Sequence, residues 1–144
     1  MVNGLFFIPL TISNSDELFC YCNKNLTYGN CCAKIHADIT LAKTAEDLMR
    51  SRYSAFVLGK INYLMESHHS STRLLNEKAD IETWAKSVQW KKLQILDTVA
   101  GLENDEEGTV RFAATFKKKN KLKTIRENSK FVKENGHWVY DGEV

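Results

Sequence analysis

Four cysteines lie within thirteen residues, and the rest of the chain contains none. They are Cys20, Cys22, Cys31 and Cys32. Zinc in a structural site takes four tetrahedral ligands, and thiolates are ligands that it favours. The eight residues between the two pairs include Asn25 and Gly29, which tolerate the left-handed backbone needed to fold one pair back onto the other. The spacing therefore predicts one structural zinc ion per chain, held by all four cysteines in a small knuckle.

Two alternatives concern the same segment. A disulfide cluster would need either a strained bridge between the adjacent Cys31 and Cys32 or two tight cross-paired loops. His36 follows closely enough to replace one cysteine as a ligand, or to lie just outside the ligands and contact them. Four thiolates on zinc leave a net charge of about −2, which Lys24 and Lys34 are placed to offset. Because four sulfurs leave no open coordination position, we expect the metal to stabilise the knuckle and not to perform chemistry.

The length and composition fit one compact domain with the knuckle attached. The chain has 144 residues, of which 43% are apolar and 26% charged, and its net charge of +2 is too small to predict binding to nucleic acid or membranes. The apolar stretch at residues 5–10 is too short to cross a bilayer and has no basic stretch before it. We therefore expect no signal peptide and no membrane insertion. Reduced cysteines favour a cytoplasmic location.

Helical periodicity follows the knuckle. Thr44 is a candidate N-cap, and the apolar residues after it recur at helical spacing up to Gly59, which permits a break. A second short helix is predicted over Ile61–Met65 and a third over Ile81–Val88. These three helices precede the part of the chain with strand periodicity.

From Trp90 onward the period falls to two, which predicts an antiparallel sheet of four strands. The strands are expected around Leu93–Ile95, Val110–Phe116 and Ile125–Val132, with a last one after the Asn135-Gly136 turn. Helices followed by a meander predict an α+β fold in which the helices cover the concave face of a cone-shaped sheet.

Arg52 lies between Leu48 and Phe56 in the middle of the apolar stripe of the first helix. A buried guanidinium needs a carboxylate, carbonyl groups or an anionic ligand. One interpretation is an internal ion pair with an acidic residue such as Glu127, whose loss would destabilise the fold by about 3–5 kcal/mol. The other is a pocket arginine that binds a small anionic molecule.

The interior of such a cone is the place to look for an active site. Besides Arg52 and Glu127, the candidate wall residues are the aromatic residues Tyr53, Trp84, Trp90, Phe112 and Trp138. The adjacent His68 and His69 are expected at a solvated helix end, since neighbouring side chains diverge. The sequence contains no glycine-rich phosphate loop and no G-x-S-x-G motif. We therefore find no positive indication of an enzyme, and the question stays open.

The cysteine segment resembles the SEC-C motif, which reads C-x-C-x-S-G-x-x-Y-x-x-C-C. The four cysteines and Tyr28 are in register with it, while Lys24-Asn25 replaces the Ser-Gly pair. Downstream, the chain resembles the YchJ-like bacterial family. The segments that carry this resemblance are Thr44–Val57, Trp84, Trp90, Glu107–Phe116, Glu127–Phe131 and Trp138–Gly142. It covers about residues 20–142 and departs at Arg126, where the family commonly has histidine.

The resemblance implies a zinc knuckle joined to an α+β cone of the nuclear transport factor type, in a family without an established biochemical activity. We expect a variable arm at residues 1–19, the knuckle at 20–36 and the cone at 37–144. The first hypothesis is an interaction module whose knuckle binds a protein partner. The second is a cone that binds a small ligand, or acts on it, through Arg52. The third is association with RNA or the ribosome through the knuckle and the lysines of residues 117–123.

Overall fold

The computed structural model describes residues 18–73 and 75–144. One antiparallel sheet has its strands in the order β1-β2-β3-β4. The strands are β1 (Gln89–Ala100), β2 (Glu107–Lys118), β3 (Lys121–Glu134) and β4 (His137–Glu143). Asn135 and Gly136 both have positive φ, which confirms the predicted tight hairpin between β3 and β4. Lys119 and Asn120 turn in the same way between β2 and β3.

The helices precede the sheet, as predicted. They are α2 (Cys32–Ala37), α3 (Ala45–Leu58), α4 (Ile61–Glu66) and α5 (Lys78–Lys86), with 3-10 helices η2 (Tyr28–Asn30), η3 (Ile39–Leu41) and η4 (Leu75–Glu77). Thr44 caps α3, since its Oγ1 accepts from the backbone N–H of Asp47 at 3.0 Å, and Gly59 ends the helix at φ 72°. α5 begins three residues before the predicted Ile81, because η4 leads directly into it.

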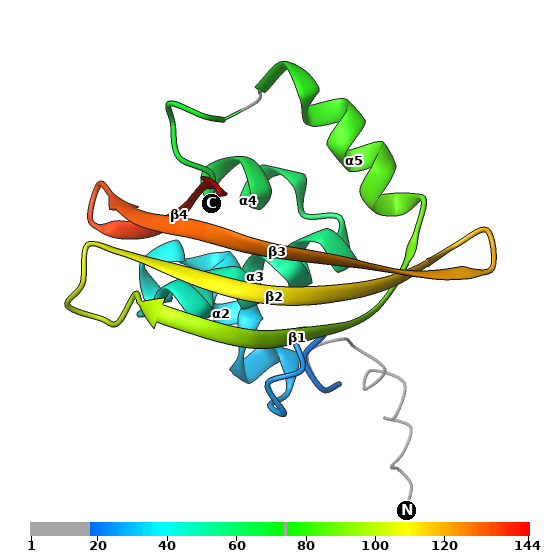
Figure 1. The fold of residues 1–144 in the computed structure, drawn as a ribbon, viewed down its shortest axis with the longest axis horizontal. Coiled ribbons are helices and arrows are strands. Elements are labelled where there is room, and N and C mark those ends of the chain that lie inside the picture. The colour runs from blue at the N-terminus through cyan, green and yellow to red at the C-terminus, as the bar shows by residue number, and fades with distance from the viewer. Residues whose placement is uncertain (1–17, 74) are drawn as a thin grey trace, which may run out of the picture.

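The helices cover one face of the curved sheet, and the N-terminal knuckle lies beside α3 near β1 (Figure 1). α3 provides the centre of the core, where Leu48 packs with Val110, Phe131 and Trp138. This arrangement confirms the predicted α+β cone with a cysteine knuckle at its N-terminal side.

The knuckle has a small buried cluster of its own. Cys20, Cys22, Tyr28 and Cys32 form this cluster, separate from the main core. Of the predicted arm, residues 1–17 lie outside the described residues. Among the described residues, no helix combines the length and apolar character needed to cross a membrane.

Candidate functional sites

The sulfur atoms of the four cysteines all lie within 4.8 Å of one another. Cys22 Sγ is 3.6 Å from Cys31 Sγ, and Cys31 Sγ is 4.0 Å from Cys32 Sγ. These S–S separations are about twice the length of a disulfide bond, and all four cysteines are free. The disulfide alternative is therefore wrong for this structure. Metal–sulfur bonds of about 2.3 Å in a tetrahedron place sulfurs about 3.8 Å apart. The arrangement is therefore compatible with a metal ion.

The crowded sulfurs perturb one another's pKa values, lowering that of Cys20 and raising that of Cys22. Burial and the neighbouring charges of Cys22 and Cys20 raise the pKa of Cys31 to about 12. The pKa of Cys32 is raised as well, by its contacts with Cys20 and Cys22 and by burial. Four thiolates crowded in this way repel one another unless a positive ion sits among them. The crowding of the cluster is thus compatible with replacement of the thiol protons by a metal ion.

Contacts with α3 and β1 hold the knuckle on the cone. Arg50 on α3 donates from Nη1 to the carbonyl of Cys22 at 2.6 Å, while its Nε pairs with Glu46 at 2.9 Å. Ser54, fully buried on the same helix, places its hydroxyl 3.6 Å from Cys20 Sγ. The side chain of Asn23 accepts from the backbone N–H of Leu93 on β1 at 2.8 Å. Sequence reasoning missed Arg50 and Ser54 because these contacts join segments about 30 residues apart.

His36 does not belong to the group of ligand atoms. Its Nε2 lies 2.8 Å from the carbonyl oxygen of Ser51, and its Nδ1 lies 2.7 Å from the hydroxyl of Tyr28. A carbonyl only accepts, so Nε2 carries the hydrogen and Nδ1 accepts from the tyrosine. Burial lowers the pKa of His36, which keeps the ring neutral. Both ring nitrogens are therefore committed to holding the knuckle against α3, and the alternative of His36 as a ligand finds no support in this geometry.

A groove of about 360 Å³ runs along the outer side of the cysteine cluster, and we call it the knuckle groove. Its lining residues are Lys24, Leu26, Asn30, Cys31, Cys32, Lys34, Ile35, Leu41, Asp47 and Arg50. Lys24 pairs with Asp47 at 3.2 Å, whereas Lys34 is exposed. Leu26 and Leu41 are 43% and 42% exposed. The groove thus combines accessible apolar surface with positive charge next to the predicted metal.

A second cavity, of about 410 Å³, lies inside the cone, and we call it the cone cavity. It is lined from α3, α4, α5 and the inner face of the sheet by Met49, Arg52, Phe56, Leu64, Met65, His68, Asp80, Ile81, Trp84, Phe112, Glu127, Ser129 and Tyr140. Four of the candidate wall residues therefore meet at one cavity, namely Arg52, Trp84, Phe112 and Glu127.

Tyr53 and Trp90 do not line the cone cavity, contrary to expectation. Tyr53 is buried with its ring edge-on to Trp90 at 5.6 Å between centroids, and Trp90 also packs on Phe56 and Phe116. The indole N–H of Trp90 donates to the carbonyl of Ala85 at 3.2 Å. Tyr53 thus belongs to the buried core, as Trp138 does, whereas Trp90 is partly buried and packs against that core.

Arg52 is buried without a direct acidic partner in the described residues. Its Nη1 donates to the carbonyl of Leu64 at 3.0 Å and to the hydroxyl of Ser67 at 2.7 Å. The guanidinium carbon lies 4.8 Å from the ring centre of Tyr140, whose hydroxyl donates to Glu127 at 2.9 Å. The predicted Arg52–Glu127 ion pair is therefore wrong, because the tyrosine stands between the two groups. Burial lowers the pKa of Arg52 to about 10, so it stays charged at neutral pH.

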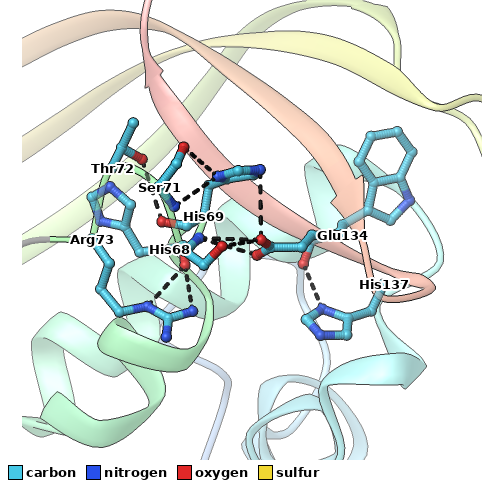
Figure 2. A network of polar contacts seen from close by, with 9 residues as sticks. His68, His69, Ser71, Thr72, Arg73, Glu134 and His137 are labelled. Atoms are coloured by element: carbon cyan, nitrogen blue, oxygen red, sulfur yellow. Dashed lines mark hydrogen bonds and ion pairs between the residues drawn. The ribbon is translucent and has the colours of Figure 1, made fainter.

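His68 also lines the cone cavity and is half-buried, so the expected solvated position is wrong for this residue. A backbone bridge to Tyr140 on β4 places it there, and its ring lies edge-on to that tyrosine at 5.1 Å. Figure 2 shows the turn that carries His68 held against the β3–β4 hairpin. Ser70 donates to the carboxylate of Glu134, and Arg73 donates to the carbonyl of His68. No local sequence pattern indicates this placement.

The pKa of His68 provides a test of this position. Burial, followed by the charges of Arg52 and Arg73, lowers its pKa from 6.5 to about 4. The unfolded chain then takes up a proton before the folded one does, so the contribution of His68 to stability is present above about pH 6.5. It is lost as the pH falls toward 4, and amounts to about 1–2 kcal/mol once solvent screening of a half-buried ring is allowed for.

We expect an NMR titration of the His68 ring to give a midpoint near 4, assigned with a His68→Asn variant. An Arg52→Met variant should move that midpoint upward, because one of the repelling charges is removed. A midpoint of 6.5 that does not respond to Arg52→Met would mean that the ring is in solvent, away from the cavity.

Comparisons with known proteins agree with this architecture. The family model of the YchJ middle, NTF2-like domain matches residues 44–142. A UPF0225 protein of Vibrio parahaemolyticus is 40% identical over 84% of this chain and 71% of its own length. Another, from Bordetella parapertussis, is 38% identical over 90% of this chain and 96% of its own length.

Two solved structures of SEC-C motif containing proteins have the same fold. The solution structure from Rhodopseudomonas palustris has a TM-score of 0.78 and 28% identity, covering 87% of this chain and 96% of the other. The crystal structure from Psychrobacter arcticus has a TM-score of 0.75 and 30% identity, covering 88% and 81%.

Proposed function

This chain belongs to the YchJ-like family, and on that premise we propose that its cysteines form a SEC-C knuckle with one structural zinc ion. The observation that carries the proposal is the gathering of four thiol sulfurs within 4.8 Å. The SEC-C motif named for two similar solved structures supports it. Zinc suits a closed tetrahedral set of thiolates because it has no redox chemistry and no need of an open position. Free cysteines support a reducing compartment such as the cytoplasm.

We further propose that the knuckle is a docking module for a protein partner. The knuckle groove supports this, because Leu26 and Leu41 offer apolar contacts beside the basic side chain of Lys34. These features favour a partner segment that carries both apolar and acidic side chains. The metal would act by keeping the groove walls in place, and not by touching the partner.

A pull-down with matched charge-reversal variants tests this function. Lys34→Glu lies in the knuckle groove, and Lys121→Glu reverses the same charge at the exposed β2–β3 tip, outside the groove. We expect Lys34→Glu to lower partner recovery at least tenfold and Lys121→Glu to leave it unchanged. The opposite pattern, with steep loss of binding in added salt and sensitivity to ribonuclease, would contradict the groove and favour RNA binding at the lysine-rich tip.

Small-ligand binding in the cone cavity is a second candidate function. The observation that favours it is a buried guanidinium, Arg52, that lines a cavity of about 410 Å³ and keeps unused donors. Cavities of this size are typical of small-molecule sites, with mostly apolar walls and a few polar groups. Because the knuckle groove and the cone cavity are separate, the two functions can be tested independently.

A further inference from the structure

The donors of Arg52 are only partly used within the protein. The side chain is 8% exposed, and both of its hydrogen bonds are made by Nη1, to Leu64 and Ser67. Across the described residues, Nε and Nη2 have no hydrogen-bond partner, and no carboxylate lies within ion-pair distance of this guanidinium. Buried N–H groups without partners are costly, more so when they carry charge. Their presence at a cavity wall indicates a missing acceptor.

The geometry of the free donors identifies the acceptor. In a planar guanidinium, Nε–H and one Nη2–H lie along the same edge, spaced to match the two oxygens of a carboxylate. Nη1 is fixed by α4, and the ring of Tyr140 lies against the guanidinium at 4.8 Å. The free edge is therefore held in one orientation before any ligand arrives, which reduces the entropy lost on binding.

The other polar groups of the cone cavity limit the ligand's charge to a single negative group. Glu127 accepts from Tyr140 and from Ser129 with the same oxygen, Oε2, and Asp80 lies on the exposed side of the cavity. These two acidic residues would repel a second anionic group. His68 presents a neutral ring and adds no charge. One carboxylate fits this balance, whereas a dicarboxylate or a doubly charged phosphate does not.

The remaining walls accept an aromatic body. Phe56 and Trp84 meet edge-on at 6.3 Å between centroids, and both line the cavity with Ile81 and Phe112. Aromatic ligands gain from edge-to-face contacts with such rings. A molecule of about ten to twelve non-hydrogen atoms occupies part of a site in this size range and leaves room for water.

We propose that the cone cavity binds a small aromatic monocarboxylate, with its carboxylate on the Nε–Nη2 edge of Arg52 and its ring against Trp84. The inference rests on the second candidate function, since it names the ligand class of that site. It makes Arg52 the specificity-determining residue and assigns the aromatic walls a general contribution to affinity.

NMR titration of the full-length, metal-loaded protein tests the proposal. The probes are 3-phenylpropanoate and its primary amide, which share an apolar body and differ in charge. The indole N–H signal of Trp84 reports on the cavity, while that of Trp138 serves as an internal control because this ring does not line it. We expect the acid to shift the Trp84 signal and to bind at least tenfold more tightly than the amide.

Two variants separate the carboxylate contact from the fold. Arg52→Lys keeps a positive charge near Leu64 and Ser67 but lacks the two-donor edge, so the acid should lose its tenfold advantage. Arg126→Lys makes the same change on the exposed side of β3 and should behave as wild type. Equal binding of acid and amide to the wild type would overturn the carboxylate assignment but leave small-ligand binding standing. If neither probe moves the Trp84 signal at millimolar concentration, both the assignment and the second candidate function fail.

Discussion

Replacing Cys31 and Cys32 together with serine should release the metal and unfold the knuckle while the cone remains folded. Elemental analysis of protein purified without added metal should find one zinc and no iron per wild-type chain, and almost none in the variant. Structural zinc contributes on the order of 10 kcal/mol to the folding of small sites. The knuckle's own buried cluster consists mainly of the cysteines, so without the metal it has almost no apolar core of its own. The main core contains none of the four cysteines.

In NMR spectra of the double cysteine variant, amide signals should therefore be lost mainly from the knuckle, while those of β1 to β4 are retained. Ser54→Ala is the matched control, because it removes a hydroxyl 3.6 Å from Cys20 Sγ but leaves every sulfur. It should still bind one zinc and release it at lower chelator concentration, since such supporting contacts are worth about 10–100-fold in affinity. Full zinc content in the double cysteine variant would contradict the assignment of the ligands.

Removing Arg52 should destabilise the cone more than removing the charge of Glu127. Arg52→Ala removes the shorter hydrogen bonds to the carbonyl of Leu64 and the hydroxyl of Ser67, which keep only their mutual contact at 3.4 Å, and it opens a space beside them. We expect a loss of about 2–4 kcal/mol in the free energy of unfolding, and about half of that for Arg52→Met, which refills the volume. Denaturant unfolding of the zinc-loaded protein measures both.

Glu127→Gln should cost less than about 1 kcal/mol, because Tyr140 and Ser129 can donate to an amide oxygen as they do to the carboxylate. One of the two interpretations of the sequence was a direct ion pair, in which losing the acidic half costs about 3–5 kcal/mol. If Glu127→Gln loses that much stability, the result would support a direct ion pair between Arg52 and Glu127. It would contradict the arrangement in which Tyr140 separates the two charges.

The sequence by itself determined the features that depend on neighbouring residues. The spacing of the four cysteines within thirteen residues predicts their cluster because a short chain can bring them together in few ways. The Thr44 cap, the Gly59 stop and the Asn135-Gly136 turn are satisfied within a few residues of themselves. Helical spacing places Arg52 on the inward face of its helix, and Glu127 was expected on a strand facing the interior; the structure confirms both positions.

Only the tertiary structure decided what these inward residues contact. Arg52 faces the end of α4 and the ring of Tyr140, and His68 reaches the cavity through a bridge to the last strand, about 70 residues away in sequence. Tyr53 and Trp90 were candidate wall residues like Trp84, but Tyr53 packs on Trp90 and Trp90 packs on Phe116, and neither lines the cavity. Periodicity specifies which face of an element is buried. Whether a buried side chain meets a cavity, a carbonyl or another ring depends on how elements distant in sequence pack together.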